Sequence, residues 1–109
     1  MRIVVENGIS THEGTVCSSS IDGVVTAGSN DFVRITNSLI MVESGKLIAP
    51  PHLGTDCETT ESHEFTPDLI QNDFVTIENE RICVVGDGFS PDPTFITDAG
   101  SNTFSEVQL

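Results

Sequence analysis

An internal repeat constrains the fold of this chain more than any other sequence feature. Residues 30–42 align without a gap on residues 72–84, and the two copies share an opening Asn-Asp-Phe-Val, two Ile, a second Asn and a final Val. Each copy is predicted to be a β-hairpin with a tight turn at Asn37-Ser38 or at Asn79-Glu80. Chance reuse of Asn, Gly and Val in β-proteins is the alternative, but a gapless match that includes a rare aromatic residue favours true repetition.

A third, partial copy lies near the end of the sequence. Residues 99–104 read Ala-Gly-Ser-Asn-Thr-Phe and match Ala-Gly-Ser-Asn-Asp-Phe at residues 27–32. The three copies therefore reach Phe32, Phe74 and Phe104 at equivalent positions. A monomer with approximate threefold symmetry can cap a homotrimer, because it presents each subunit with a similar edge and closes an otherwise open β-structure.

The rest of the sequence favours one all-β domain that spans residues 1–109. Helical periodicity is weak, and short β-branched runs alternate with Gly, Asn, Asp, Ser and Pro. Residues 47–67 are predicted to be an ordered loop region with one short helical turn around residues 59–63. The predicted strands are residues 3–5, 14–17, 24–26, 31–36, 39–43, 74–78, 81–85, 94–96 and 103–107.

Composition limits the size of the apolar core and the classes of binding partner. Hydrophobic residues make up 37% of the chain, and its six aromatic residues are all Phe. A core this thin often needs a staple such as a metal ion. The formal net charge of −13 disfavours nucleic-acid binding, which depends on clustered Lys and Arg. The acidity fits an ordinary solvated surface, a high-salt environment or a basic partner.

Targeting signals and a disulfide framework are not indicated. The apolar patch in the first residues is too short for the hydrophobic region of a signal peptide, and no apolar run reaches the length of a membrane span. The three cysteines are an odd number without the paired spacing of small secreted domains. Free thiols or a metal ligand are therefore expected.

Four segments carry a resemblance to a known family. They are Thr-His-Glu-Gly-Thr-Val at residues 11–16, Gly-Ser-Asn-Asp-Phe-Val at 28–33, Pro-Pro-His at 50–52 and Asn-Glu-Arg-Ile-Cys-Val-Val-Gly-Asp at 79–87. These segments resemble the PAAR-repeat proteins, which are short cone-shaped β-proteins at the apex of trimeric spikes in type VI secretion systems and contractile phage tails. The likeness spans roughly residues 8–107.

Departures from the family pattern indicate a divergent, phage-like member. The Pro-Ala-Ala-Arg motif is replaced in both copies, the first copy lacks the Val-Gly-Asp ending, and the late Cys expected soon after Asp87 is missing. The resemblance implies a cone-shaped PAAR-like fold and a non-enzymatic role in piercing membranes. The protein would be a monomer in isolation, and one tip would cap a homotrimeric β-helical spike and meet the target cell membrane. It would be made in the cytoplasm without a signal peptide and act in a virion, at the phage tail baseplate, or outside the cell after contractile injection.

The resemblance also implies one structural zinc ion near the apex, held by three His and one Cys. The three histidines of the chain, His12, His52 and His63, are all predicted to lie in turns or loops. Structural zinc takes four N or S ligands in a closed tetrahedron, and it can contribute on the order of 10 kcal/mol where a tapering point has little apolar interior. Another transition metal such as iron is the alternative ion.

Two cysteines are candidates for the fourth metal ligand. Cys57 is preferred because it lies between His52 and His63, and Cys17, which follows Val16 on a predicted strand, is the reserve. Cys83 occupies the repeat position of Met41 and is predicted to be a small core residue. The alternative to a metal site is three surface imidazoles and a buried Cys57.

Two other functions compete with the spike tip. One is a small zinc hydrolase with three protein ligands, an open water position and Glu13 or Glu64 as general base; a fourth protein ligand would exclude it. The other is a structural or carbohydrate-binding β-module of a virion. No Ser-His-Asp set, phosphate-binding loop or Cys-His dyad stands out in the sequence.

Overall fold

The computed structural model describes residues 1–12, 21–49, 63–89 and 94–108, and these residues contain strands but no helix. Six strands form one antiparallel sheet in the order β6-β5-β2-β1-β10-β9, and two further pairs form the small hairpins β3-β4 and β7-β8. The all-β prediction is therefore confirmed. The strand bounds are β1 Ile9–His12, β2 Ile21–Val25, β3 Arg34–Ile35, β4 Ser38–Leu39, β5 Leu47–Ala49, β6 His63–Phe65, β7 Thr76–Ile77, β8 Glu80–Arg81, β9 Gly88–Phe89 and β10 Thr94–Asp98.

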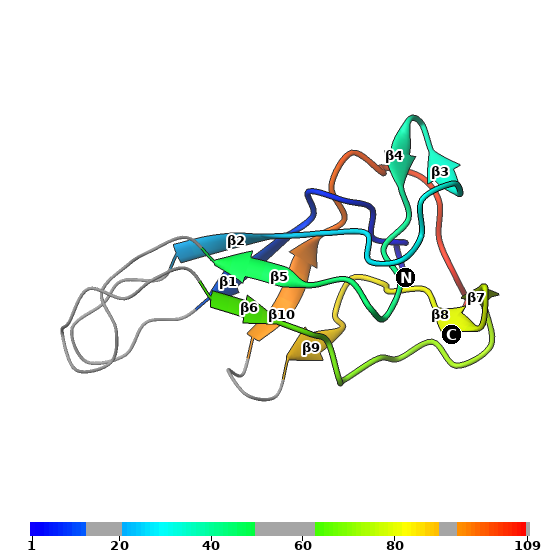
Figure 1. Cartoon of the computed structure of the whole chain (residues 1–109). Helices are drawn as coiled ribbons and strands as arrows, with labels where there is room; N and C mark the ends of the chain where they lie inside the picture. Colours follow the sequence, from blue (N-terminus) through cyan, green and yellow to red (C-terminus); the bar gives the residue numbers. More distant parts are fainter. Residues whose placement is uncertain (13–20, 50–62, 90–93, 109) are drawn as a thin grey trace, which may run out of the picture.

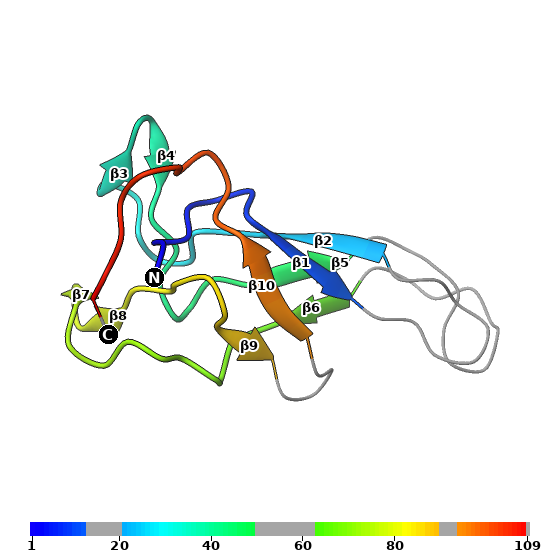
Figure 2. The ribbon, with the colours of Figure 1, turned by 180° about the vertical axis from the view of Figure 1, so that it is seen from behind.

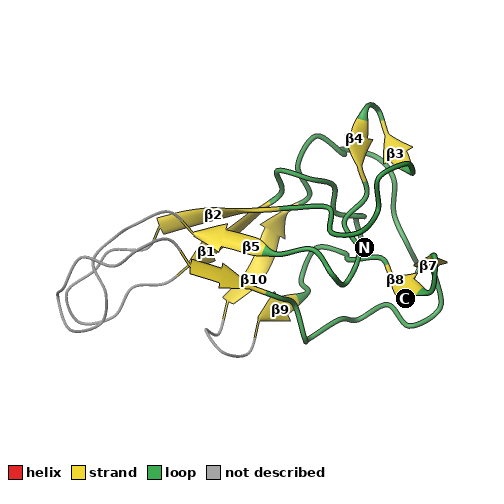
Figure 3. Ribbon diagram, in the orientation of Figure 1, coloured by secondary structure: helices red, strands yellow, loops and turns green. Residues whose placement is uncertain are grey.

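The molecule has two ends of different construction. The strand pairs β1-β2, β5-β6 and β9-β10, which we call the arms, lie on one side, and β3-β4, β7-β8 and both chain termini lie on the other (Figures 1 and 2). Antiparallel pairing of β2 with β5 and of β1 with β10 joins the arms (Figure 3). The bridge between Leu69 and Gly88 connects the segment after β6 to β9, so that the sheet curls almost to closure. The molecule is elongated, with extents of 40 × 24 × 23 Å.

A ring of three backbone hydrogen bonds lies between the two ends. The Val4 amide donates to the Cys83 carbonyl at 3.0 Å, Cys83 donates to Met41 at 2.9 Å, and Met41 donates to Val4 at 2.9 Å. These residues are the centres of three short segments, residues 3–5, 40–42 and 82–84, which we call the axial segments. Three bridges repeat the same relation around the ring, namely Val5 with Ile40, Val42 with Ile82 and Ile3 with Val84. The three copies are therefore arranged around one pseudo-threefold axis, as the sequence repeat predicted.

The axial segments separate two small cores. Alternate residues of an extended segment point to opposite sides, and their central residues pack with the arm residues Val25, Leu47, Phe89 and Ile96. The flanking residues form a second cluster with residues of the hairpins, such as Val33, Ile35, Val75 and Ile77. Cys83 is a free, fully buried thiol in the first cluster, as predicted. Burial raises the pKa of this thiol well above its ordinary value, so the residue acts as a small hydrophobe.

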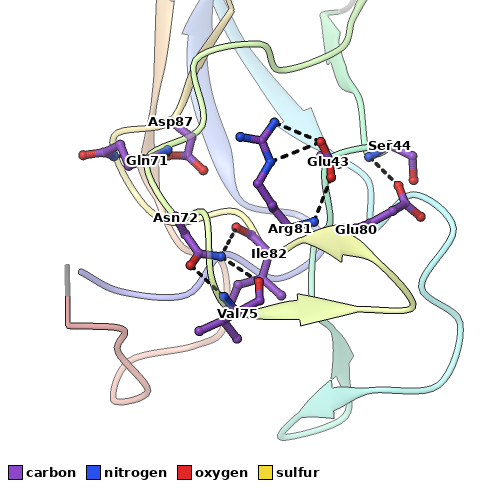
Figure 4. Close-up of polar contacts among 9 residues, drawn as sticks. All are labelled: Glu43, Ser44, Gln71, Asn72, Val75, Glu80, Arg81, Ile82 and Asp87. Atoms are coloured by element: carbon purple, nitrogen blue, oxygen red, sulfur yellow. Dashed lines mark hydrogen bonds and ion pairs between the residues drawn. The ribbon is translucent and has the colours of Figure 1, made fainter.

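A buried asparagine anchors each copy to the axial segments. The Asn72 Oδ1 atom accepts hydrogen bonds from the amides of Phe74 at 3.2 Å and Val75 at 3.0 Å. Its Nδ2 atom donates to the carbonyls of Val75 at 2.7 Å and Ile82 at 3.2 Å (Figure 4). Asn30 makes the same four bonds within its own copy. Each side chain thus uses both donors and both acceptor positions of its amide, which suits a fully buried Asn.

The two ends of the chain complete the third copy. Asn102 Nδ2 donates to the Ile3 carbonyl at 2.8 Å, where the other copies use Ile40 and Ile82. The Met1 ammonium donates to the Val107 carbonyl at 2.6 Å, and the Val107 amide donates back to the Met1 carbonyl at 2.7 Å. Met1 and Val107 therefore pair at the place where the other two copies have a hairpin turn.

The hairpins are confirmed, but their turns lie one residue earlier than predicted. Thr36 and Asn37 have φ angles of 47° and 70°, and Glu78 and Asn79 have 51° and 70°. Two consecutive residues with positive φ define the type I′ turn, whose twist matches that of the flanking strands, and Asn tolerates this conformation well. Ser38 and Glu80, which were predicted to be turn residues, begin β4 and β8.

Other predicted strand bounds need correction. The prediction of a loop over residues 47–67 is wrong at both ends, because β5 and β6 lie there, and His63 is a strand residue. Strands β1 and β9 were not predicted. The predicted strands at 31–36, 74–78 and 103–107 are too long, because the Asn-anchored turns occupy their first residues. The predicted strand 14–17 and residues 59–62 of the predicted helical turn lie outside the described residues.

We expect Asn72→Ala to destabilise the protein by about 3 kcal/mol or more, because two amides and two carbonyls, one buried and three partly buried, lose their partner. Asn30→Ala and Asn102→Ala should have effects of similar size. Asn79→Gly, in an exposed turn with positive φ, is the control and should change stability by less than about 0.5 kcal/mol. Urea unfolding measures the differences. An Asn72→Ala variant as stable as the wild type would contradict the anchoring role.

Candidate functional site

Two of the four predicted metal ligands lie within the described backbone, at one end of the sheet. His12 is the last residue of β1 and pairs with Ile21, and His63 is the first residue of β6 and pairs with Ala49. Their prediction as turn or loop residues is therefore wrong. Strands β2 and β5 lie between them, so their backbones are about 14 Å apart along the sheet at about 4.8 Å per strand.

The pairing register adds a second relation between these two positions. His12 pairs with Ile21, which lies four residues before Val25 on β2. Val25 pairs with Leu47, and Leu47 pairs with Phe65, two residues after His63. His12 and His63 consequently occupy the same phase of strand alternation. His52, Cys57 and the reserve ligand Cys17 lie outside the described residues.

The described residues also bear on the predicted general bases. Glu64 forms an exposed ion pair with Lys46 at 3.4 Å, and Glu13 lies outside the described residues. Within the part of the chain that the structure describes, no group of three or more His, Cys, Asp or Glu residues could hold a metal ion.

Three exposed phenylalanines occupy equivalent positions around the pseudo-threefold axis. Phe32, Phe74 and Phe104, which we call the Phe triplet, are 56%, 61% and 66% exposed. Each lies two residues after a buried Asn, whose Oδ1 atom accepts a hydrogen bond from the Phe amide at 3.2–3.3 Å. Positions related by a rotation axis lie at one height along it, so the triplet forms a ring. The sequence revealed the equivalence of these residues but not their exposure.

Most of the acidic charge lies outside the end of the molecule that carries the hairpins. We define the base as residues 1–3, 30–40, 72–82 and 102–108, which hold the anchors, the hairpins and the terminal pair. The base contains five acidic residues and all three arginines of the chain, a net charge of −2. The remaining residues carry 12 acidic side chains and one lysine, so −11 of the total −13 lies outside the base.

Side-chain contacts between copies are not symmetric. Glu43 Oε1 accepts a hydrogen bond from the Arg81 amide at 2.9 Å, and its Oε2 atom accepts two from the Arg81 guanidinium at 3.0 and 3.3 Å (Figure 4). At the equivalent places, the Glu6 amide donates to Leu39 and the Val85 amide donates to Arg2, so neither pair joins a carboxylate to a guanidinium. Arg2 and Val85 instead line a pocket of about 430 Å³. The symmetry thus holds for the backbone and its Asn anchors but not for these contacts.

In the second copy, a buried carboxylate replaces a backbone carbonyl as hydrogen-bond acceptor. In the first and third copies the Val42 and Val5 amides donate to the carbonyls of Ala27 and Ala99, each at 3.0 Å. The second copy lacks the Ala-Gly-Ser segment, and its Val84 amide donates to the Asp87 Oδ2 atom at 2.9 Å. Asp87 Oδ1 accepts from the Gln71 amide at 3.0 Å.

Asp87 is fully buried, and this burial raises the pKa of its carboxyl group, whereas the bonds from Val84 and Gln71 favour the ionised form. The sequence signal for this role was the Val-Gly-Asp ending, which only the second copy carries.

Sequence comparison adds no assignment to this geometry. The chain matches no protein-family model, and no curated protein is significantly similar to it. Among the residues that the structure describes, no helix is long and apolar enough to cross a membrane. The threefold arrangement, the Phe triplet and the charge division therefore carry the functional interpretation.

The Glu43–Arg81 pair predicts a pH dependence. The hydrogen bond from the Arg81 amide, followed by those from its side chain, lowers the pKa of Glu43 below 4.5. Its stabilisation is then fully present above about pH 4.5 and is lost as the pH falls through the folded-state pKa. Since the pair is partly exposed, Glu43→Gln should cost less than about 1 kcal/mol at pH 7 and less at pH 3 than at pH 7. Urea unfolding at both pH values checks this, with Glu78→Gln as the control, and an equal cost at both would contradict it.

Proposed function

We propose that this protein is the non-enzymatic tip of a membrane-piercing spike, which caps a homotrimeric β-helical spike protein in a contractile injection machine or phage tail baseplate. The observation that carries this proposal is the ring of hydrogen bonds among Val4, Met41 and Cys83, which gives one chain three equivalent units around an axis. A homotrimer ends in three identical edges, and a pseudo-threefold monomer can cover all three at once.

The different construction of the two ends supports a docking direction in which the base faces the spike. The base carries the equivalent hairpins and a net charge of only −2, so it can approach three subunits without strong repulsion. The arms lead away from it on the other side of the molecule (Figure 1). In this arrangement the base meets the spike and the arms lead toward the target membrane.

The ends of the arms are the place for the proposed metal ion. Among the described residues, both apolar clusters include residues of the axial segments, whereas His12 and His63 lie at the ends of two arms in the same strand phase. We propose that His12, His52, His63 and Cys57 hold one zinc ion, or another transition metal such as iron. Four protein ligands would close the coordination sphere, so the ion would tie the arms together and supply no reactive water.

Metal analysis of the purified full-length chain should give one zinc ion per molecule by X-ray fluorescence. His12→Ala and Cys57→Ser should each lose the ion, and Cys83→Ala, which changes a thiol in the core, should retain it. A chelator should lower the melting temperature. A metal-free protein with an unchanged melting temperature would favour a structural or carbohydrate-binding module, and loss of zinc in Cys17→Ser but not in Cys57→Ser would transfer the fourth ligand to Cys17.

Stoichiometry tests the capping role directly. The protein alone should be a monomer, and mixing it with the trimeric spike protein of the same particle should give one chain per trimer by native mass spectrometry. A spike shortened at its apex is the control and should not bind. Three chains per trimer, or no complex with the intact spike, would contradict the proposal.

A further inference from the structure

We infer that the Phe triplet is the set of anchors through which the base docks, and that the partner presents three equivalent apolar pockets with little charge around them. This inference rests on the proposed function and names the residues and chemistry of its interface. Phe32, Phe74 and Phe104 are each more than half exposed, at equivalent positions around one axis. A partner that fits all three sites equally has threefold symmetry itself.

The fold of the monomer gives no reason for these aromatic side chains. Neither apolar cluster contains any member of the triplet. Neighbouring exposed positions vary among the copies: Asp31, Asp73 and Thr103 precede the three Phe, and Arg34, Thr76 and Glu106 follow two residues later. Phe is retained in all three copies although a polar residue would be more soluble at an exposed site. Retention within one chain therefore points to a contact that all three sites share.

The triplet is also held ready for binding. Each Phe amide donates to the Oδ1 atom of a buried Asn, and that Asn is bonded in turn to an axial segment. The backbone beneath each ring is thereby fixed before a partner arrives. A Phe side chain has only two rotatable bonds, so its immobilisation costs little entropy.

The size and charge of the surface fit an apolar interface. At roughly 200 Å² per Phe side chain, the exposed parts of the triplet amount to about 350 Å². One partner in a standard interface contributes about 800 Å², so these residues alone supply nearly half of it. The base also holds all three arginines but only five of the 17 acidic residues, and aromatic residues and Arg are enriched at interfaces whereas Asp and Glu are depleted. A strongly basic partner would fit the acidic remainder of the molecule better than the base.

The experiment compares single substitutions in the triplet with a matched control. Phe32→Ser, Phe74→Ser and Phe104→Ser should each weaken binding to the trimeric spike at least tenfold, and by factors that agree within about threefold because the pockets are equivalent. The triple variant should not bind. Phe95→Ser is the control. Phe95 is 50% exposed but lies on the β10 arm, so the affinity of this variant for the spike should stay within about twofold of the wild-type affinity. Calorimetric titration gives the dissociation constants, and circular dichroism should show that all variants remain folded.

The possible outcomes separate this inference from the proposed function. If the wild type binds one per trimer and the three single variants bind equally well, the triplet is not the anchor set, whereas the capping role stands. If the wild type does not bind the trimer, both fail. Light scattering covers a further alternative: a wild-type dimer that becomes monomeric in the Phe variants would assign the triplet to contact between copies of this chain and overturn the inference.

Discussion

The closed cycle of hydrogen bonds among Val4, Met41 and Cys83 is the constraint on which the rest of the structure depends. Segments of three residues are too short to be stable as strands alone, and each one gains its partners only when all three meet. The contributing residues are distant in sequence, so the loop entropy of two long connections must be overcome before all three bonds have formed. The Asn anchors offset part of that cost, because each one makes three hydrogen bonds within its own turn and donates a fourth to a carbonyl of an axial segment.

Around this centre the chain divides its chemistry between two ends. The base has equivalent hairpins, three exposed aromatic rings and little net charge, and most of the acidic residues lie elsewhere. Backbone symmetry is kept wherever the axial segments require it, and the Asn anchors and the Phe triplet follow it, whereas other side-chain contacts differ between copies, as Glu43 with Arg81 and Val85 with Arg2 show. Asp87 shows where side chains cannot vary. In the second copy no Ala carbonyl is present to accept from the Val84 amide, and the buried Asp87 carboxylate accepts that hydrogen bond instead.

The sequence predicted features that depend on residue identity at repeated positions, and it failed for features that depend on pairing. The all-β class, the threefold repetition, both hairpins and the burial of Cys83 followed from the aligned copies. The turns were placed one residue late because Asn37 and Asn79 suit positive φ but do not show which neighbour shares it. Strands β5 and β6 were missed because partners elsewhere in the sheet determine them, and for the same reason His12 and His63 were expected in loops. Of the predicted ligand set, His52 and Cys57 lie outside the described residues, so the set as a whole remains a prediction.

The pairing of Met1 with Val107 has a consequence for how the three copies are connected. These two residues pair where the other two copies have a two-residue turn, so the third copy is assembled from residues 1–3 and residues 102–107. A cut at Thr36-Asn37 or at Glu78-Asn79 would leave every axial contact intact. The order of the copies along the polypeptide is therefore independent of how the axial segments pack against one another.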